Sequence, residues 1–258
     1  MPSPKSYWFY LCLSCAGCAD ISTPIRANKI AIVAKQSSSK PKRLSLVGAA
    51  VFLLGAMLVG YAVYGETIDS MLASQEQTDL AKTTQRDFSS EPDNAATKPA
   101  EAEVFAVLYA PKLGEDFRRP VAEGTSVEDV LNTVGIGHYL NTAFPGEPGN
   151  VALASHRTTH GGAFNYIDRL IPGDRIYLET RLGWYTYEVY ESATVKASDL
   201  WVISRKPTDL AGDKILTLTT CTPRYTSEKR LVVWANQVDY RTRLMGPPDE
   251  IKDLAESE

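Results

Sequence analysis

Cys221 is the residue whose type and position best suit nucleophilic chemistry in this chain. It ends the run Leu216–Cys221 (LTLTTC), whose alternating leucines and threonines predict a β-strand. Side chains alternate between the two faces of a strand, so we expect the two leucines to face the core and Cys221 to lie on the more polar side. Most free cysteines are small buried hydrophobes. Cys221 is therefore a candidate nucleophile only if neighbouring groups activate its thiol.

A thiol nucleophile needs a nearby base or cation to act at neutral pH. Arg230 lies one loop further along the chain, at the start of the apolar strand predicted for Leu231–Ala235. The chain has three histidines, at positions 138, 156 and 160. His156 follows the strand predicted for Val151–Ala154 and is the best placed base. The spacing alone leaves His138 as an alternative.

The elements that would position these residues are short strands, which begin near Glu103. Turn residues separate the β-rich runs Val104–Leu108, Val151–Ala154, Ile176–Glu179, Tyr185–Tyr190, Ile215–Thr220 and Leu231–Ala235. Single helical turns are expected at Val127–Leu131 and Asn165–Leu170. Many short strands at this spacing predict a mainly β domain, either a sandwich or a barrel.

An uncharged apolar run from Leu44 to Tyr64 precedes this domain. As a helix it would be roughly 31 Å long, which matches a bilayer core of about 30 Å. The residues just before the run are basic: Lys35, Lys40, Lys42 and Arg43. Glu66 and Asp69 follow it. Because lysine and arginine are retained on the cytoplasmic side, we expect a single-pass protein of the cell membrane with its N-terminus inside and its C-terminal domain outside.

The remaining segments carry weaker signals. Residues 1–43 are expected to be a cytoplasmic tail, in which Cys12, Cys15 and Cys18 lack a fourth ligand for a metal and favour neither a metal site nor a disulfide framework. Residues 65–101 are polar, with few large apolar side chains, and predict a flexible stalk. The net charge is −4, and the C-terminal half has no basic stripe, which disfavours a nucleic-acid partner.

Three stretches carry the strongest motifs of the domain: residues 154–165 (ASHRTTHGGAFN), 217–221 (TLTTC) and Arg230 before an apolar strand. They are supported by residues 138–139 (HY), 142–150 (TAFPGEPGN) and 172–174 (PGD). Together these stretches resemble the sortase family. The resemblance covers about residues 104–240. The HRTT and GHY stretches are most similar to class E sortases of Gram-positive actinobacteria. Ser155 departs from the pattern, since glycine usually precedes the histidine.

The resemblance implies a fold and a set of site residues. The fold is the closed eight-stranded sortase β-barrel with short helices, which we place at residues 102–246, with 247–258 as a C-terminal tail. Carried over by position, Cys221 is the nucleophile, His156 the general acid and base, and Arg230 the stabiliser of the oxyanion or substrate. The substrate-binding residues implied are Thr220, His138 and Tyr139.

The resemblance also implies a reaction. A sortase of this kind cleaves a C-terminal Leu-Pro-x-Thr-Gly motif, or Leu-Ala-x-Thr-Gly for class E, after the threonine. It holds a thioacyl intermediate and passes the surface protein to an amine of the peptidoglycan precursor. No cofactor or metal is expected, because no acidic cluster in the sequence supports the calcium site that some sortases have.

Three alternatives remain open. The first is a pilin-polymerising sortase whose acceptor is a pilin lysine, although the Asp-Pro-aromatic lid motif usual in that class is missing upstream of the domain. The second is a thiol protease that only hydrolyses. The third is a membrane-anchored binding domain without catalytic activity.

Overall fold

The computed structural model describes residues 43–90 and 98–257. Residues 51–90 and 98–257 belong to one compact unit. The segment with Cys12, Cys15 and Cys18 lies outside the described residues, so the expectations for it stay predictions.

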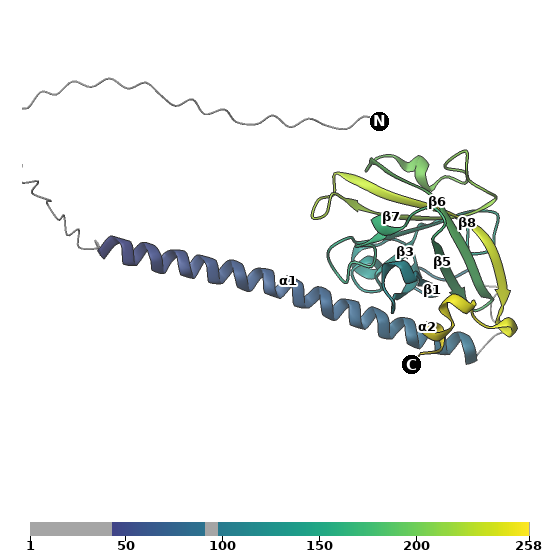
Figure 1. Cartoon of the computed structure of the whole chain (residues 1–258), viewed down its shortest axis with the longest axis horizontal. Helices are drawn as coiled ribbons and strands as arrows, with labels where there is room; N and C mark the ends of the chain where they lie inside the picture. Colours follow the sequence, from purple (N-terminus) through teal and green to yellow (C-terminus); the bar gives the residue numbers. More distant parts are fainter. Residues whose placement is uncertain (1–42, 91–97, 258) are drawn as a thin grey trace, which may run out of the picture. The chain divides into compact units, whose positions relative to one another are not determined.

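The described strands form a closed barrel in the order β1-β2-β3-β4-β7-β8-β6-β5 (Figure 1). Their bounds are β1 Val104–Tyr109, β2 Arg118–Glu123, β3 Ile136–His138, β4 Gly149–Ser155, β5 Arg175–Thr180, β6 Gly183–Lys196, β7 Lys214–Thr222 and β8 Lys229–Thr242. β2 pairs with β3, and β4 with β7, in parallel, whereas the other neighbours are antiparallel. The expected closed eight-stranded barrel is confirmed.

Short helices lie between the strands and after the last of them, as expected for this fold. They are η1 Pro111–Leu113, η2 Val127–Leu131, η3 Ile167–Arg169, η4 Leu200–Ile203, η5 Arg243–Met245, η6 Asp249–Ile251 and α2 Lys252–Glu256. The turns predicted at Val127–Leu131 and Asn165–Leu170 correspond to η2 and η3. The residues expected as a C-terminal tail instead form η6 and α2, where Ile251 and Ala255 are buried.

The sequence pattern missed two strands. β2 contains Arg118, Arg119 and Pro120, which are atypical of a strand, and β3 spans only three residues. Both are buried and paired with neighbours on either side. Their strand conformation is set by barrel closure rather than by their own propensity.

The barrel core confirms the alternation predicted for β7. Leu216 and Leu218 lie in the core with Val151 and Leu153 of β4 and Val233 of β8. The outer face of β7 is less open than predicted. Thr217 and Thr219 are buried on this face. The hydroxyl of Thr217 donates to Asn150 Oδ1 (2.7 Å), and that of Thr219 donates to the carbonyl of Leu153 (3.1 Å). A polar outer face on a strand can therefore be covered when its hydroxyls are satisfied.

The N-terminal helix α1 runs without interruption from Arg43 to Ser90, a length of 48 residues (Figure 1). By length and composition, α1 is the one helix among the described residues that could cross a membrane. Its most apolar stretch has a mean hydropathy of 2.3, and none of that stretch is buried. This helix contains the whole run predicted as a span, residues 44–64, which makes α1 a candidate membrane anchor.

The segment expected to be a flexible stalk differs from that expectation. Residues 65–90 continue α1, and its buried side chains include Gln77, Ala81 and Phe88. Ala81 and Phe88 pack in one apolar cluster with Tyr109 and Trp184 of the barrel. The stalk was predicted from the low apolar content of the segment. Its buried residues are spaced four and seven apart, however, and therefore line a single face of a helix.

Candidate active site

Cys221 lies near the end of β7, between β4 and β8. It is half-buried and is a free cysteine. In the antiparallel pairing of β7 with β8, Cys221 is directly opposite Arg230. Paired residues in a sheet point to the same side. The side chains of Cys221 and Arg230 therefore emerge together on the outer face, on which Val232 and Trp234 also pack.

His156 lies on the other side of Cys221. The parallel register of β4 with β7 ends at Ala154 opposite Thr219. His156 lies one residue beyond the end of β4, and Cys221 lies two residues beyond Thr219 in β7. Cys221 and Arg230 are thus paired across β7 and β8, and His156 follows the end of the strand on the other side of β7.

Asn132 orients the imidazole of His156. The residue follows η2, and its Oδ1 lies 2.8 Å from Nε2 of His156. An amide oxygen accepts, so Nε2 carries the proton of the neutral ring. Nδ1 is then the nitrogen left for proton transfer. Asn132 was not identified from the sequence, where the only signal was that it directly follows the predicted turn at Val127–Leu131.

Arg157 holds the end of β7 in place. Its buried guanidinium donates to Thr222 Oγ1 (2.7 Å) and to the carbonyl of Cys221 (3.5 Å). The same group forms an ion pair with Asp168 (3.3 Å). Since Arg157 follows His156 directly, one dipeptide supplies the candidate base and a tether for the candidate nucleophile. The HRTT stretch contained Arg157, but its spacing could not assign it this contact.

Arg230 donates to the chain that precedes it. Its Nη1 lies 3.0 Å from the carbonyl of Ser227 and 3.1 Å from that of Lys229. These bonds close the loop between β7 and β8, beside Cys221. One end of the guanidinium is therefore anchored to this loop, and the group has further N–H donors that could bind a substrate.

A model of the family described as the sortase domain matches residues 108–238. This chain belongs to the sortase family. It is 34% identical over 217 residues to sortase SrtE1 of Streptomyces coelicolor, an alignment that covers 80% of this chain and 60% of that protein. The chain thus spans about 60% of the length of that relative.

Two solved structures are also similar to this sortase. Sortase E1 from Streptomyces coelicolor, solved with a tripeptide in the active site, has 38% identity and a TM-score of 0.55, and the match covers 60% of this chain and 99% of that one. Sortase E from Streptomyces avermitilis has 36% identity and a TM-score of 0.54, with 59% and 99% covered. Both are class E sortases, in agreement with the class indicated by the HRTT and GHY stretches.

The residues expected to bind substrate in this sortase fall into two groups. Tyr139 is half-buried, and its hydroxyl lies 3.1 Å from Thr219 Oγ1, on the outer face that also carries Cys221. Thr220 is 2% exposed, and its hydroxyl donates to the carbonyl of Ser155 (2.8 Å). The expectation of direct substrate contact fits Tyr139 and does not fit Thr220, which faces inward and is already bonded.

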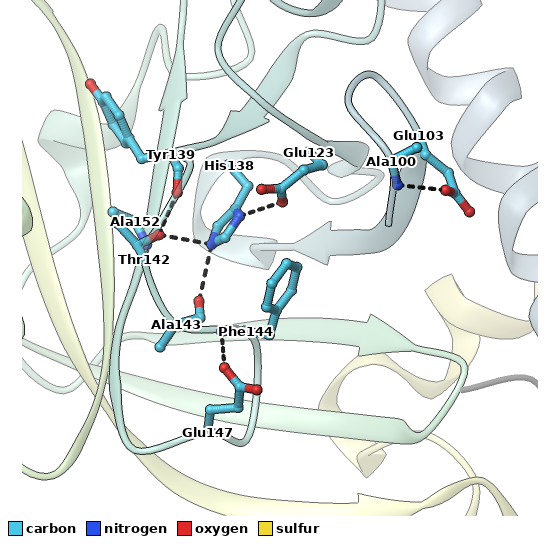
Figure 2. A network of polar contacts seen from close by, with 10 residues as sticks. All are labelled: Ala100, Glu103, Glu123, His138, Tyr139, Thr142, Ala143, Phe144, Glu147 and Ala152. Carbon is cyan, nitrogen blue, oxygen red and sulfur yellow. Dashed lines mark hydrogen bonds and ion pairs between the residues drawn. The ribbon is translucent and has the colours of Figure 1, made fainter. Parts of the chain in front are cut away.

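His138 does not fit direct substrate contact either, because it is 0% exposed. Figure 2 shows its ring held between Glu123 and the turn that follows Tyr139. Nδ1 lies 2.6 Å from a Glu123 carboxylate oxygen, and Nε2 lies 2.8 Å from Thr142 Oγ1 and 3.0 Å from the carbonyl of Ala143. The pair fixes the turn that follows Tyr139, which gives His138 a structural role. Its roles as substrate contact or alternative base stay predictions.

His160 modifies the candidate base. Its ring lies 5.2 Å from that of His156, centroid to centroid. Burial is the main cause that lowers the pKa of His156, and a second positive charge on His160 lowers it further. The neutral imidazole is therefore favoured at neutral pH, which suits a group that must accept a proton before it can donate one.

We predict that His160→Asn raises the pKa of His156 towards its ordinary value. The substitution removes a like charge and opens the site to water, and both changes favour the imidazolium. Asparagine tolerates the positive φ of 49° at this position. An NMR titration of the His156 ring, assigned by comparison with His156→Gln, measures the shift. An unchanged or lower pKa would show that His160 has no electrostatic role.

No group of three or more His, Cys, Asp or Glu side chains able to hold a metal ion occurs in residues 43–90 and 98–257. The expectation that this sortase uses no metal or cofactor stays a prediction.

Proposed function

We propose that this sortase is a cysteine transpeptidase that cleaves a C-terminal Leu-Pro-x-Thr-Gly or Leu-Ala-x-Thr-Gly motif after the threonine and transfers the threonine to an amine. The observation that carries the proposal is the pairing of Cys221 with Arg230 across β7 and β8, with His156 following the end of β4 on the other side of β7. The similar sortase E1, which holds a tripeptide in its active site, supports a peptide as the substrate.

In the first half of the proposed reaction, the thiol of Cys221 passes its proton to His156, and the resulting thiolate sulfur attacks the threonine carbonyl. A tetrahedral intermediate forms, and its oxyanion is stabilised by the guanidinium of Arg230. The C–N bond to glycine then breaks as protonated His156 delivers a proton to the leaving amine. The products are a thioester on Cys221 and a free peptide that begins with glycine.

In the second half, an acceptor amine attacks the thioester carbonyl and the C–S bond breaks. His156, now neutral, takes the proton that the amine loses, and the thiolate is regenerated. Asn132 keeps the ring oriented through both steps by its bond to Nε2. The lowered pKa of His156 makes it a better proton donor to the first leaving group, at the cost of a smaller protonated fraction.

The proposed site of action is the outer surface of the cell membrane. The apolar part of α1 would anchor the chain, with the N-terminus in the cytoplasm and the barrel outside. The substrates would be surface proteins that carry the sorting motif, and the acceptor would be an amine of the peptidoglycan precursor. The net charge of −4 gives no support to a nucleic-acid partner.

Mass spectrometry of sorting peptides incubated with the full chain in detergent micelles tests the proposal. Transfer is expected when a diamino-acid peptide that mimics the cell-wall precursor is added. Hydrolysis alone, with or without the amine, would identify a thiol protease. Preference for a lysine within a pilin peptide would favour the pilin-polymerising class. If no product forms and a thiol probe does not label Cys221, the result would favour a binding domain without catalytic activity.

We predict that Arg230→Ala lowers kcat/KM by roughly 10²- to 10³-fold, the loss typical of an oxyanion-stabilising donor. Arg230→Lys should recover only part of this, because lysine lacks the planar fork of donors. Lys229→Ala, which removes the exposed cation next in sequence, is the matched control and should stay near the wild-type value. Steady-state kinetics with the sorting peptide measures all three. Equal losses for Arg230→Ala and the control would remove Arg230 from the mechanism.

A further inference from the structure

The part of α1 that follows the apolar run presents a stripe of side chains to the barrel. Its members are spaced alternately four and three residues apart, as one helix face requires: Ser70, Ser74, Gln77, Ala81, Thr84 and Phe88. The backbone N–H of Gly161 donates to Ser70 Oγ (3.2 Å), and Arg119 donates to Ser74 Oγ (2.8 Å). These contacts lie within the compact unit to which residues 51–90 and 98–257 belong. The stripe is mostly small or polar, so the helix approaches the loops of the barrel closely.

Gln77 is the fully buried polar member of the stripe. It is 0% exposed, and its Nε2 donates to the carbonyl of His160 (3.0 Å). A Cβ on Gly135 would lie 2.6 Å from its amide, and one on Gly161 would lie 2.7 Å away. Both glycines also have positive φ, of 101° and 79°. The amide is thus inserted between two loops whose glycines leave just enough room for it.

These two loops hold the neighbours of His156. The loop that ends at Gly135 starts from Asn132, which bonds His156 Nε2. The other loop contains His160, whose ring packs against His156 and whose carbonyl accepts from Gln77. Gln77 therefore contacts, or closely approaches, both segments that orient the proposed base, although it lies far from the site in the sequence.

We propose that Gln77 is a positioning residue of this sortase, through which the helix that continues from the candidate membrane span holds His156 between Asn132 and His160. The role of His156 in catalysis rests on the proposed function, whereas the contact itself does not. The helix then has two functions, as an anchor and as a part of the active-site support.

Gln77→Met in the full chain in detergent micelles tests this role, because methionine keeps the length of the side chain and loses the donor to His160. Gln77 Oε1 has no hydrogen-bond partner in the structure, so only the bond from Nε2 is lost. We expect kcat to fall about tenfold, which corresponds to about 1.4 kcal/mol, with KM changed less than twofold. Gln75→Met, on the exposed side of the same helix, is the matched control and should leave both values unchanged.

A titration of the His156 ring by NMR separates positioning from a purely structural role. Release of the His160 loop should let water reach the ring and should weaken the repulsion from His160, so the pKa of His156 should rise in Gln77→Met and stay constant in Gln75→Met. Unchanged kcat together with an unchanged titration would overturn the proposal. Because the titration needs no substrate, it gives its answer even if wild-type chain transfers no peptide.

A second variant covers the case in which Gln77→Met does not fold, as judged by its thermal unfolding. Ser70→Ala removes only the acceptor for the N–H of Gly161, at the edge of the same contact. It should raise the pKa of His156 in the same direction by a smaller amount. If a folded Ser70→Ala chain gave a wild-type titration and wild-type kcat, the helix would have no part in positioning His156.

Discussion

Cys221→Ala is expected to abolish both cleavage of a sorting peptide and its transfer to an amine. Among the described residues Cys221 is the only cysteine, so the variant has no thiol there with which a thioester could form. Loss of a covalent nucleophile typically reduces kcat by 10⁴-fold or more, on the order of the whole contribution of the catalytic groups. Mass spectrometry of the peptide, with and without the amine, measures cleavage and transfer in one experiment.

The fold is expected to survive this substitution. Cys221 is half-buried near a strand end, and its removal leaves little cavity. Thermal unfolding of the variant should match that of wild type, so that a loss of activity reports chemistry. A mass increase of a bound acyl-peptide on wild-type chain, absent from Cys221→Ala, would identify the intermediate. If the variant still joined peptide to amine, Cys221 would not be the nucleophile.

His156→Gln is expected to lower kcat/KM by roughly 10²- to 10⁴-fold, the range that a positioned general acid and base contributes. Glutamine is close to histidine in size and retains an amide donor for Asn132, so the loop should keep its place. It cannot donate a proton to the leaving amine or accept one from the acceptor. Steady-state kinetics with the sorting peptide gives the loss, and burst-phase kinetics shows which half-reaction is slowed.

Two other histidine variants serve as references for this prediction. His160→Asn removes the neighbouring ring and should cost far less activity than His156→Gln. His138→Gln changes the buried pair with Glu123 and should lower thermal stability more than it lowers kcat in the chain that remains folded. Wild-type kcat/KM in His156→Gln would show that proton transfer uses another group.

The local pattern of the sequence determined the parts of this protein that depend on neighbours along the chain. Alternation along Leu216–Cys221 placed the leucines in the core and the cysteine outside because the period of a strand is two residues, whatever it pairs with. The uncharged run at 44–64 indicated a candidate span because its length and composition are sufficient for that inference. The order of several motifs indicated the family, which the match over residues 108–238 confirmed.

Tertiary structure alone decided which residues meet across long loops. Asn132 reaches His156, and Gln77 reaches His160, through contacts that no periodicity in the sequence encodes. Barrel closure buried His138 and Thr220, which the motifs had suggested as substrate contacts, and it turned the charged segment of β2 into a paired strand. The polar segment after the span became a docked helix because the barrel offers a surface that its single apolar and small face can cover. Burial and pairing are properties of the whole fold, so the role of a residue near the site depends on its neighbours in space. Its secondary structure depends largely on its neighbours in the chain.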